Sequence, residues 1–537
     1  MRRFLFDEGL IQADLVLLNA KIYTMEPSRP TASALAILGD RIIYVGDSDG
    51  ARQLVGPKTK VVDLEGKTVI PGLIDTHVHM MSFGRSLGWV DLRDARSVSE
   101  LVSRLRERAE STPAGRWIVG YGWDQERFVE RRYPTRWDLD EASEEHPIVI
   151  YRTCLHLCVA NSLALQLAGI SRETQPPEGG VIELDETLGE PNGVLRETAM
   201  ELVRRAIPRP SLEEAVVDAE RACREAVKHG LTSVHWIMED PIELRALQRL
   251  RAEGRLPLRV YAILPVELAG RLSELGIEMG FGDEWLRIGA VKLFLDGSLG
   301  ARTAALKEPY SDKPDTSGRL LYGWEELRDL VLAVHRAGLQ LVMHAIGDKA
   351  IEMALSALEN ALNEYPSPHR HRIEHVSVLN EHLLSRMAKL KVLASVQPHF
   401  VVSDFWVDKR LGPRRVRWVY AFKSLLKAGI SVSAGSDCPV EPINPFLGIE
   451  AAVNRKDNPE EALSVEEALR LYTINAAYAS GEENLKGSIA QGKLADFVIL
   501  DENPFSVAPE KLGAVCVLAT IVGGRPVYLR ESAGFEF

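Results

Sequence analysis

Both ends of the chain show the period-two pattern of short strands. Apolar positions alternate or cluster over residues 13–18, 34–38, 41–45 and 60–63, and again over residues 487–500, 513–522 and 525–529. Turn signals such as Gly39-Asp40 separate neighbouring stretches, as expected of hairpins. We therefore predict one discontinuous β domain that is built from both termini.

The middle of the chain alternates strands with helices. Ser211-Leu-Glu-Glu214 is a capping box, and apolar residues continue from it at helical spacing as far as Gly230. Strand-like apolar runs occur at residues 69–79, 231–236, 258–264, 286–295, 339–344, 370–376, 392–397 and 430–434. Eight strands alternating with helices predict an α/β fold of the (β/α)8 TIM-barrel type, whose active site lies at the carboxyl ends of the strands. A doubly wound open sheet is the structural alternative.

A long excursion, at about residues 84–205, separates the first strand from the second. Residues 98–109 have helical spacing, and residues 180–195 resemble a hairpin. An insertion after the first strand of a barrel lies on the catalytic face, where it would act as a lid or a specificity wall. An inert stabilising excursion is the alternative.

Composition narrows the class of protein. The net charge of -12 and the pI near 5.7 argue against a nucleic-acid or anionic-membrane surface. The first nine residues hold too few apolar residues for a signal-peptide core, and no apolar run in the sequence is long enough to span a membrane. The cysteines are few and scattered, and we interpret Cys154 and Cys158 as buried thiols rather than a redox or metal pair. We expect a cytoplasmic protein without a disulfide framework.

Candidate metal ligands stand at the ends of several predicted strands. His77 and His79 lie two apart on one strand, so they share a face. His344, His375 and Asp437 end three later strands. Imidazole and carboxylate groups at one barrel mouth suit zinc and similar ions. The alternative is that each histidine is a packed structural residue and that Asp437 caps a helix.

Lys292 lies within the apolar strand at residues 286–295, on the same face as Phe294 and Asp296. Burial lowers the pKa of a lysine. A neutral amine can react with carbon dioxide, and the resulting carbamate can bridge two metal ions. The alternative is an ordinary ion pair between Lys292 and Asp296.

These residues, in this strand order, resemble the amidohydrolase superfamily of metal-dependent (β/α)8 hydrolases. Val69-Ile-Pro-Gly-Leu-Ile-Asp75 and the strand-like run at 492–500 are also similar to that family. The resemblance implies a small composite β-sandwich from residues 1–69 and 483–537 around a barrel at 70–482. Further segments resemble the branch with N-substituted formamide deformylases: Gly122-Trp-Asp124, His156 with Asn161, residues 292–304 and His344-Ala-Ile-Gly-Asp348.

The resemblance also implies a mechanism. The implied metal ligands are His77, His79, Lys292, His344, His375 and Asp437. Two divalent ions, Zn²⁺ first and Mn²⁺, Fe²⁺ or Co²⁺ as alternatives, would be bridged by carbamylated Lys292. A hydroxide shared by the metals would attack a non-peptide carbon–nitrogen bond, such as an amide, N-acyl or N-formyl bond, of a small molecule. Asp437 would carry the proton to the leaving amine.

Other residues are candidates for touching substrate or orienting ligands. Near the strand ends these are Asp296, His235, Gln397 and His399, and in the insertion they are Trp123, Asp124 and His156, which would project into the pocket. We expect a small-molecule substrate and no nucleic-acid or membrane partner, and we leave a homodimer open.

Two other functions remain as alternatives. A mononuclear deaminase of an amino-substituted heterocycle typically carries His-x-x-Glu after the fifth strand and lacks the lysine, whereas this chain has His344-Ala-Ile-Gly-Asp348 and Lys292. A non-catalytic barrel scaffold would have lost ligands, and this chain keeps the set complete.

Overall fold

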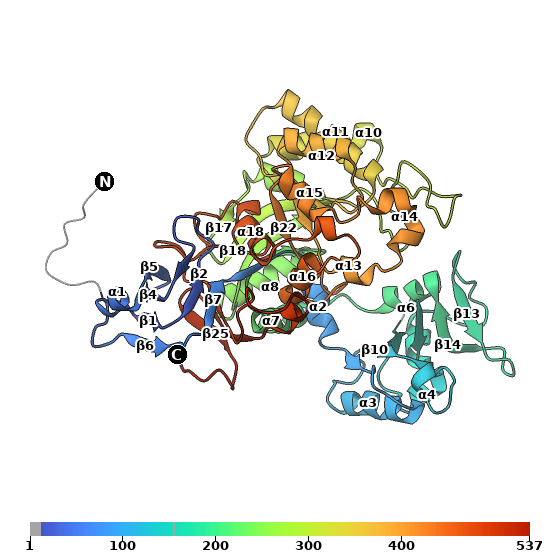
Figure 1. Cartoon of the computed structure of the whole chain (residues 1–537). Coiled ribbons are helices and arrows are strands. Elements are labelled where there is room, and N and C mark those ends of the chain that lie inside the picture. The colour runs from blue at the N-terminus through green and yellow to red at the C-terminus, as the bar shows by residue number, and fades with distance from the viewer. Residues whose placement is uncertain (1–11, 154–155) are drawn as a thin grey trace. The chain divides into compact units, whose positions relative to one another are not determined.

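The computed structural model describes residues 12–153 and 156–537, which form two compact units (Figure 1). One unit comprises the described part of Met1–Gly84 together with Ala215–Phe537, and the other is Arg85–Glu214. The amino-terminal residues in which we expect no signal peptide, and Cys154, lie outside the described residues.

The larger unit contains the predicted barrel. Its strands, in spatial order, are β8 (Leu73–Val78), β15 (Leu231–Ile237), β16 (Arg259–Pro265), β18 (Leu286–Phe294), β19 (Gln340–Ala345), β20 (Arg372–His375), β21 (Leu393–Val396) and β22 (Val432–Ala434). All neighbours in this order pair in parallel. At the open seam, the backbone N–H of Asp437 donates to His77 O at 2.7 Å, and that of His79 donates to Cys438 O at 2.9 Å. The predicted fold class is confirmed.

Amphipathic helices connect the barrel strands. They include α7 (Leu212–Lys228), α8 (Pro241–Ala252), α10 (Trp324–Arg336), α11 (Asp348–Glu364), α12 (Glu381–Leu390) and α15 (Phe422–Lys427). The predicted capping box precedes α7: Ser211 N donates to Glu214 Oε2, and Glu214 N donates to Ser211 Oγ. Helix α11 buries Ile351, Leu355 and Leu358, which recur at helical spacing on one face.

Strands from both termini form the predicted β-sandwich. One sheet holds β5 (Arg41–Gly46), β4 (Ala34–Leu38), β1 (Leu15–Leu18) and β6 (Lys60–Asp63); the other holds β25 (Arg525–Leu529), β24 (Val517–Val522), β23 (Phe497–Leu500), β7 (Thr68–Pro71), β2 (Lys21–Tyr23) and β3 (Thr31–Ala32). The amino-terminal and carboxyl-terminal segments meet where β7 pairs antiparallel with β23. Leu17, Leu35, Ile499 and Ile521 share one hydrophobic core.

Gly72 divides what the sequence suggested was a single strand at residues 69–79. Strand β7 before it belongs to the sandwich, and β8 after it begins the barrel. A Cβ on residue 72 would lie 2.1 Å from Thr232 Oγ1, so only glycine fits this close approach to β15. The prediction of one strand was wrong because the pattern of apolar residues continues through this change of sheet.

The Arg85–Glu214 unit has its own sheet and core. Its strands run in the order β13 (Val181–Leu184), β14 (Pro191–Arg196), β12 (Leu157–Ala160), β11 (Ile148–Arg152), β10 (Ile118–Trp123) and β9 (Val90–Asp91). Strands β13 and β14 form the predicted hairpin, and helix α3 (Val98–Glu110) matches the predicted helix at 98–109. The excursion is therefore an independently packed body of secondary structure.

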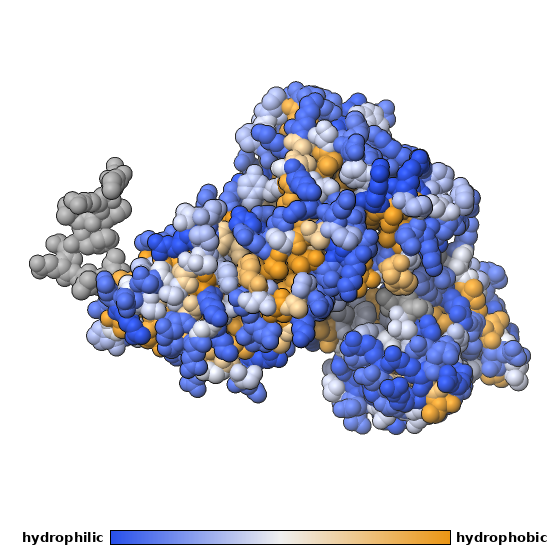
Figure 2. All heavy atoms as spheres, in the orientation of Figure 1, coloured by the Kyte–Doolittle hydropathy of each residue, from blue (hydrophilic) through white to orange (hydrophobic). Residues whose placement is uncertain are grey.

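Hydrophilic side chains cover most of the face shown in Figure 2. None of the helices within residues 12–153 and 156–537 combines the length and the apolar composition that a membrane crossing requires. Cys158, Cys223 and Cys438 are buried free thiols, as we expect for Cys158.

Candidate metal centre

The predicted ligands meet at the carboxyl end of the barrel. Nitrogen and oxygen atoms of His77, His375 and Asp437 all lie within 4.8 Å of one another, and the three residues are buried. His375 and Asp437 have φ angles of 70° and 60°, in the left-handed region that non-glycine residues rarely adopt. Such backbone geometry concentrates at functional sites, where surrounding structure enforces it.

His79 and His344 complete the group. His79 Nε2 lies 3.3 Å from Asp437 Oδ1, the same atom that is 3.3 Å from His77 Nε2. The ring centroid of His344 is 4.5 Å from that of His375. Four histidines and one aspartate from four different strand ends thus gather in one place.

Side chains hold the first and last strands together beneath this group. Asp75 Oδ1 accepts hydrogen bonds from His77 N at 2.9 Å and from Ser436 N at 3.1 Å. A Cβ on residue 435 would lie 2.4 Å from His77 N, so Gly435 allows this approach. These contacts fix the backbone on both sides of the seam from which His77 and Asp437 project.

Lys292 is buried in the barrel. The residue is 3% exposed, and among the described residues its Nζ has no hydrogen-bond partner. Nζ lies 5.0 Å from the ring centroid of Phe294. Burial lowers the pKa of Lys292 to about 8, although Glu374 and Asp437 oppose the shift. An unpartnered amine in this position does not fit the ordinary ion pair with Asp296.

The carboxylate of Asp296 binds backbone N–H groups of two loops. Its carboxylate accepts from the backbone N–H groups of Ala305 (2.9 Å), Ile346 (3.0 Å) and Gly347 (2.9 Å). It therefore ties the loop after β18 to the loop after β19. His344 Nε2 donates to Gly297 O at 3.0 Å and lies 3.5 Å from Asp296 Oδ1, so the loop after β18 orients this candidate ligand.

The imidazoles at the second half of the site are neutral. Burial, together with the charge of Lys292, lowers the pKa of His344 to about 3. Burial also lowers the pKa of His375 well below its ordinary value. The pKa of His79 is raised to about 9, since hydrogen bonds to Asp437 and Glu239 outweigh its burial. Neutral imidazole is the form that binds metal, so His344 and His375 are ready to act as ligands.

The donor set fits a bound metal group. Lys292 Nζ, His375 Nδ1 and Gln397 Oε1 are buried, and none has a hydrogen-bond partner in the part of the chain that the structure describes. Buried polar atoms are nearly always paired, so three unpaired atoms near one barrel mouth require an explanation. Imidazole, carboxylate and carbamate are groups that zinc and similar divalent ions accept.

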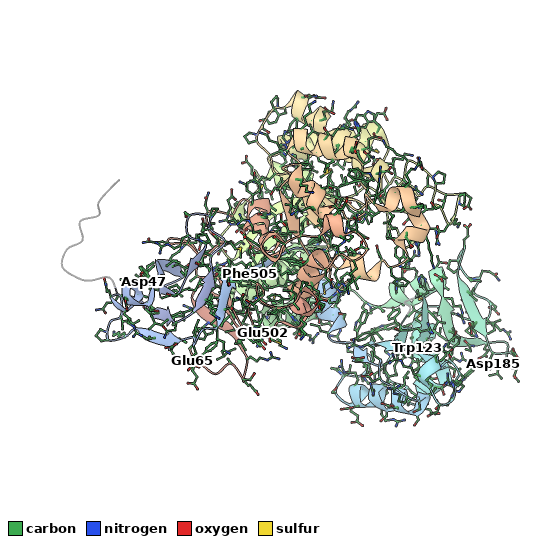
Figure 3. The ribbon with its side chains drawn as sticks, viewed as in Figure 1. Asp47, Glu65, Trp123, Asp185, Glu502 and Phe505 are labelled. Carbon is green, nitrogen blue, oxygen red and sulfur yellow. The ribbon has the colours of Figure 1, made fainter. Side chains whose placement is uncertain are left out.

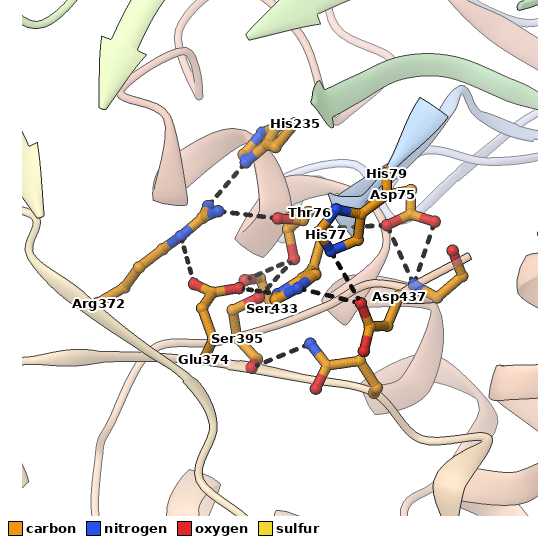
Figure 4. A network of polar contacts seen from close by, with 12 residues as sticks. Asp75, Thr76, His77, His79, His235, Arg372, Glu374, Ser395, Ser433 and Asp437 are labelled. Carbon is orange, nitrogen blue, oxygen red and sulfur yellow. Dashed lines mark hydrogen bonds and ion pairs between the residues drawn. The ribbon is translucent and has the colours of Figure 1, made fainter. Parts of the chain in front are cut away.

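Two charged residues inside the barrel were not among our candidates. Arg372 and Glu374 lie on β20, are fully buried, and contact His235 and His77 respectively (Figure 4). The sequence did indicate their importance, because Arg-x-Glu places two charged side chains on one face of a buried strand. Lys292 is a charged residue in a similar position on β18. His235 is 0% exposed and its Nδ1 accepts from Arg372, and a contact between His235 and substrate stays a prediction.

Two predicted residues follow strand β21. Gln397 Nε2 donates to Ser395 O at 3.4 Å. His399 Nδ1 forms a short contact with the carboxylate of Glu441, a buried residue that sequence reasoning missed. Substrate contact by Gln397 and His399 stays a prediction.

The three candidates in the insertion have contacts with residues of the same unit. Trp123 is fully buried in the core of that unit, where its Nε1 donates to Ile150 O at 3.3 Å (Figure 3). Its ring therefore does not project into a pocket, contrary to our prediction, because the strand turns this side chain inward. Asp124 pairs with Arg152 at 2.9 Å, and exposed His156 pairs with Glu197 at 2.9 Å. For Asp124 and His156, contact with substrate stays a prediction.

The sequence profile of the amidohydrolase family matches residues 60–528. The chain belongs to the amidohydrolase family. YtcJ of Bacillus subtilis, which carries the name of an amidohydrolase, is 35% identical over 94% of this chain and 98% of its own. The N-substituted formamide deformylase of Arthrobacter pascens is 29% identical over 97% of this chain and 99% of its own.

Solved structures agree with this family membership. An uncharacterised metal-dependent hydrolase from Pyrococcus furiosus superposes with a TM-score of 0.80 at 38% identity, and the match covers 92% of this chain and 100% of that one. This amidohydrolase is thus a metal-dependent hydrolase, and its candidate ligands lie where a barrel enzyme holds its active site.

Proposed function

We propose that this amidohydrolase cleaves a carbon–nitrogen bond outside peptides, in an N-formyl or N-acyl derivative of a small cytoplasmic amine. The observation that carries the proposal is the meeting of His77, His375 and Asp437 beside the buried, unpartnered amine of Lys292. The similarity to an N-substituted formamide deformylase supports the choice of bond.

Two divalent ions would occupy the centre, with zinc as our first choice. His77, His79 and Asp437 would hold one ion, and His344 and His375 would hold the other. When bound, such ions supply water activation near neutral pH and polarise the scissile carbonyl.

Lys292 would join the two halves of the centre as a carbamate. Its pKa of about 8 leaves part of the amine unprotonated near neutral pH. Nζ then forms an N–C bond to carbon dioxide and releases one proton, and the product has two carboxylate oxygens where the amine had one donor atom. The step turns a neutral amine into an anion, which suits a position between divalent cations.

Asp437 would move the proton during hydrolysis. Burial alone would raise the pKa of Asp437, but His77 and His79 hold it well below its ordinary value, so the side chain is a carboxylate that can accept a proton. It would take the proton of the attacking water and deliver it to the leaving nitrogen.

The test combines metal content with a substrate panel. After loading with Zn²⁺, elemental analysis should approach two ions per chain, and the protein should hydrolyse members of a panel of N-formyl amines, N-acyl amines and cyclic amides. Lys292→Ala should lose one ion and most activity, and short carboxylic acids should partly restore both. One ion at full activity, with deamination of heterocycles only, would instead support the mononuclear deaminase.

A further inference from the structure

The imidazole of His77 is held from both sides by carboxylates. Its Nδ1 forms a short hydrogen bond to Glu374 Oε2, while its Nε2 lies 3.3 Å from Asp437 Oδ1. The residue is 1% exposed, so water does not compete for either nitrogen. Nε2 thus faces the candidate metal centre, and Nδ1 faces the interior of the barrel (Figure 4).

Glu374 is itself clamped in position. Its other oxygen, Oε1, forms an ion pair with Arg372 Nε at 2.7 Å, and both side chains are 0% exposed. Arg372 donates further hydrogen bonds to His235 Nδ1 and to Thr76 O, each at 2.8 Å. The guanidinium is therefore held by β15 and β8 at the same time, with its Nε against Oε1 of Glu374.

We propose that Glu374 is a positioning residue for His77 and that Arg372 fixes Glu374 in that role; the inference rests on the metal centre proposed above. A carboxylate can only accept, so it keeps the imidazole proton on Nδ1 and leaves the Nε2 lone pair directed at the metal. A carboxylate behind a histidine ligand also raises its basicity, and loss of such a partner typically weakens metal binding about 10–100-fold.

The ordinary alternative is that Glu374 merely neutralises the charge of buried Arg372. A neutralising carboxylate could have given both oxygens to the guanidinium in a bidentate pair. Instead Glu374 gives one oxygen to Arg372 and the other to His77. This division of its two oxygens is the geometry that a positioning role requires.

The chain provides two matched carboxylates for comparison. Glu239 lies 3.3 Å from Nδ1 of the other paired histidine, His79, but its side chain is 59% exposed. Glu243 is buried, and it accepts from Trp236 Nε1 at 2.7 Å and from the backbone N–H groups of Glu239 and Asp240. Glu239→Gln therefore measures the same pairing at an exposed position. Glu243→Gln measures the loss of a buried carboxylate that caps α8 and, in the described part of the chain, has no hydrogen bond to a candidate ligand side chain.

The experiment measures Zn²⁺ affinity of the full-length protein by competition with a chromophoric chelator, and thermal unfolding with and without Zn²⁺. We expect Glu374→Gln to weaken the Zn²⁺ site that includes His77 about 10–100-fold and to reduce the rise in Tm that Zn²⁺ produces. Glu239→Gln should have a smaller effect. Glu243→Gln should lower the Tm of the metal-free protein while leaving Zn²⁺ affinity unchanged.

If Glu374→Gln fails to fold because Arg372 loses its counter-charge, the double variant Arg372→Met/Glu374→Gln removes both charges and should show the same loss of affinity. Unchanged Zn²⁺ affinity in either folded variant would overturn the inference and leave the proposed function intact. Failure of the wild-type protein to bind Zn²⁺, Mn²⁺, Fe²⁺ or Co²⁺ would overturn both, so the two failures are distinguishable.

Discussion

One histidine lies at the amino end of strand β20 and another at its carboxyl end, and the two differ in their hydrogen bonds. His371 precedes the strand at the amino end, and His375 closes it at the carboxyl end. Both are buried and both belong to histidine clusters. Composition and burial do not distinguish them, whereas their hydrogen bonds do.

The cluster at the amino end is fully paired. His371 Nδ1 accepts from Leu341 N at 3.0 Å, and its Nε2 meets His335 Nδ1 at 2.8 Å. His335 Nε2 in turn meets Tyr365 O at 2.8 Å. Because a backbone N–H only donates and a carbonyl only accepts, each ring carries its proton on Nε2. This series of hydrogen bonds joins β19, α10 and the segment before β20, so the role of these histidines is structural.

The cluster at the carboxyl end contains buried polar atoms that have no hydrogen-bond partner in the part of the chain that the structure describes. His375 Nδ1 and Lys292 Nζ have no hydrogen-bond partner within the described residues, and His375 has a positive φ. Of these two buried histidines, His371 has both nitrogens satisfied within the fold, whereas His375 keeps a nitrogen that is unpaired among the described residues, beside other candidate ligands, where a ligand can bind. Each prediction below tests this distinction.

The largest effect is expected at the carboxyl end from Asp437→Asn. The four histidines and Lys292 remain, so much of the metal should stay bound. Loss of proton transfer should lower kcat about 10²–10⁴-fold, with less change in KM because the transfer belongs to the transition state. A metal-replete variant with a kcat near that of the wild type would show that the proton takes another route.

The sequence carried enough information for the barrel and for most of the ligand set. Period two along each strand fixed which residues share a face, and barrel topology placed His77, His344, His375 and Asp437 at one mouth. The sequence did not show which side chains make contact between strands that are distant in the chain. The bond between Glu374 and His77 joins residues 297 positions apart, so only the fold brings them together.

The same reasoning explains the errors. Trp123 ends an alternating strand, and the sequence did not say which face of the sheet the insertion buries. The change of sheet at Gly72 leaves the apolar pattern unbroken. In each case a choice between two faces or two sheets depended on tertiary packing, which local patterns do not encode.

A paired substitution tests the two ends directly. His375→Ala should lower metal content, since it removes a ligand. His371→Ala should leave metal content unchanged and lower the free energy of unfolding by about 1–3 kcal/mol, because it strands the N–H of Leu341 and the Nδ1 of His335. Metal analysis and chemical denaturation of both variants measure the contrast. Loss of metal from folded His371→Ala would show that the two ends are coupled.

The smallest effect is a pH dependence at the amino end. Burial lowers the pKa of His371 well below its ordinary value, with the neighbouring rings of His369 and His335 adding to the shift. The unfolded chain takes up this proton near pH 6.5 and the folded chain does not. The unfolding free energy therefore holds its full value above about pH 6.5 and falls as the pH drops below it, by up to about 1.4 kcal/mol per pH unit for one proton.

His371→Gln should remove this contribution and flatten the dependence of unfolding free energy on pH below about pH 6.5. His382→Gln, at an exposed position on α12, is the matched control and should keep the wild-type slope. Denaturation of metal-free protein across the acidic range measures all three slopes, and the histidines of the metal centre contribute equally to each because none of the substitutions touches them. Equal slopes for the His371 and His382 variants would show that His371 takes up a proton in the folded protein without loss of stability. The hydrogen bonds of the amino-end histidine cluster would then not be the structural contacts that the comparison assumes.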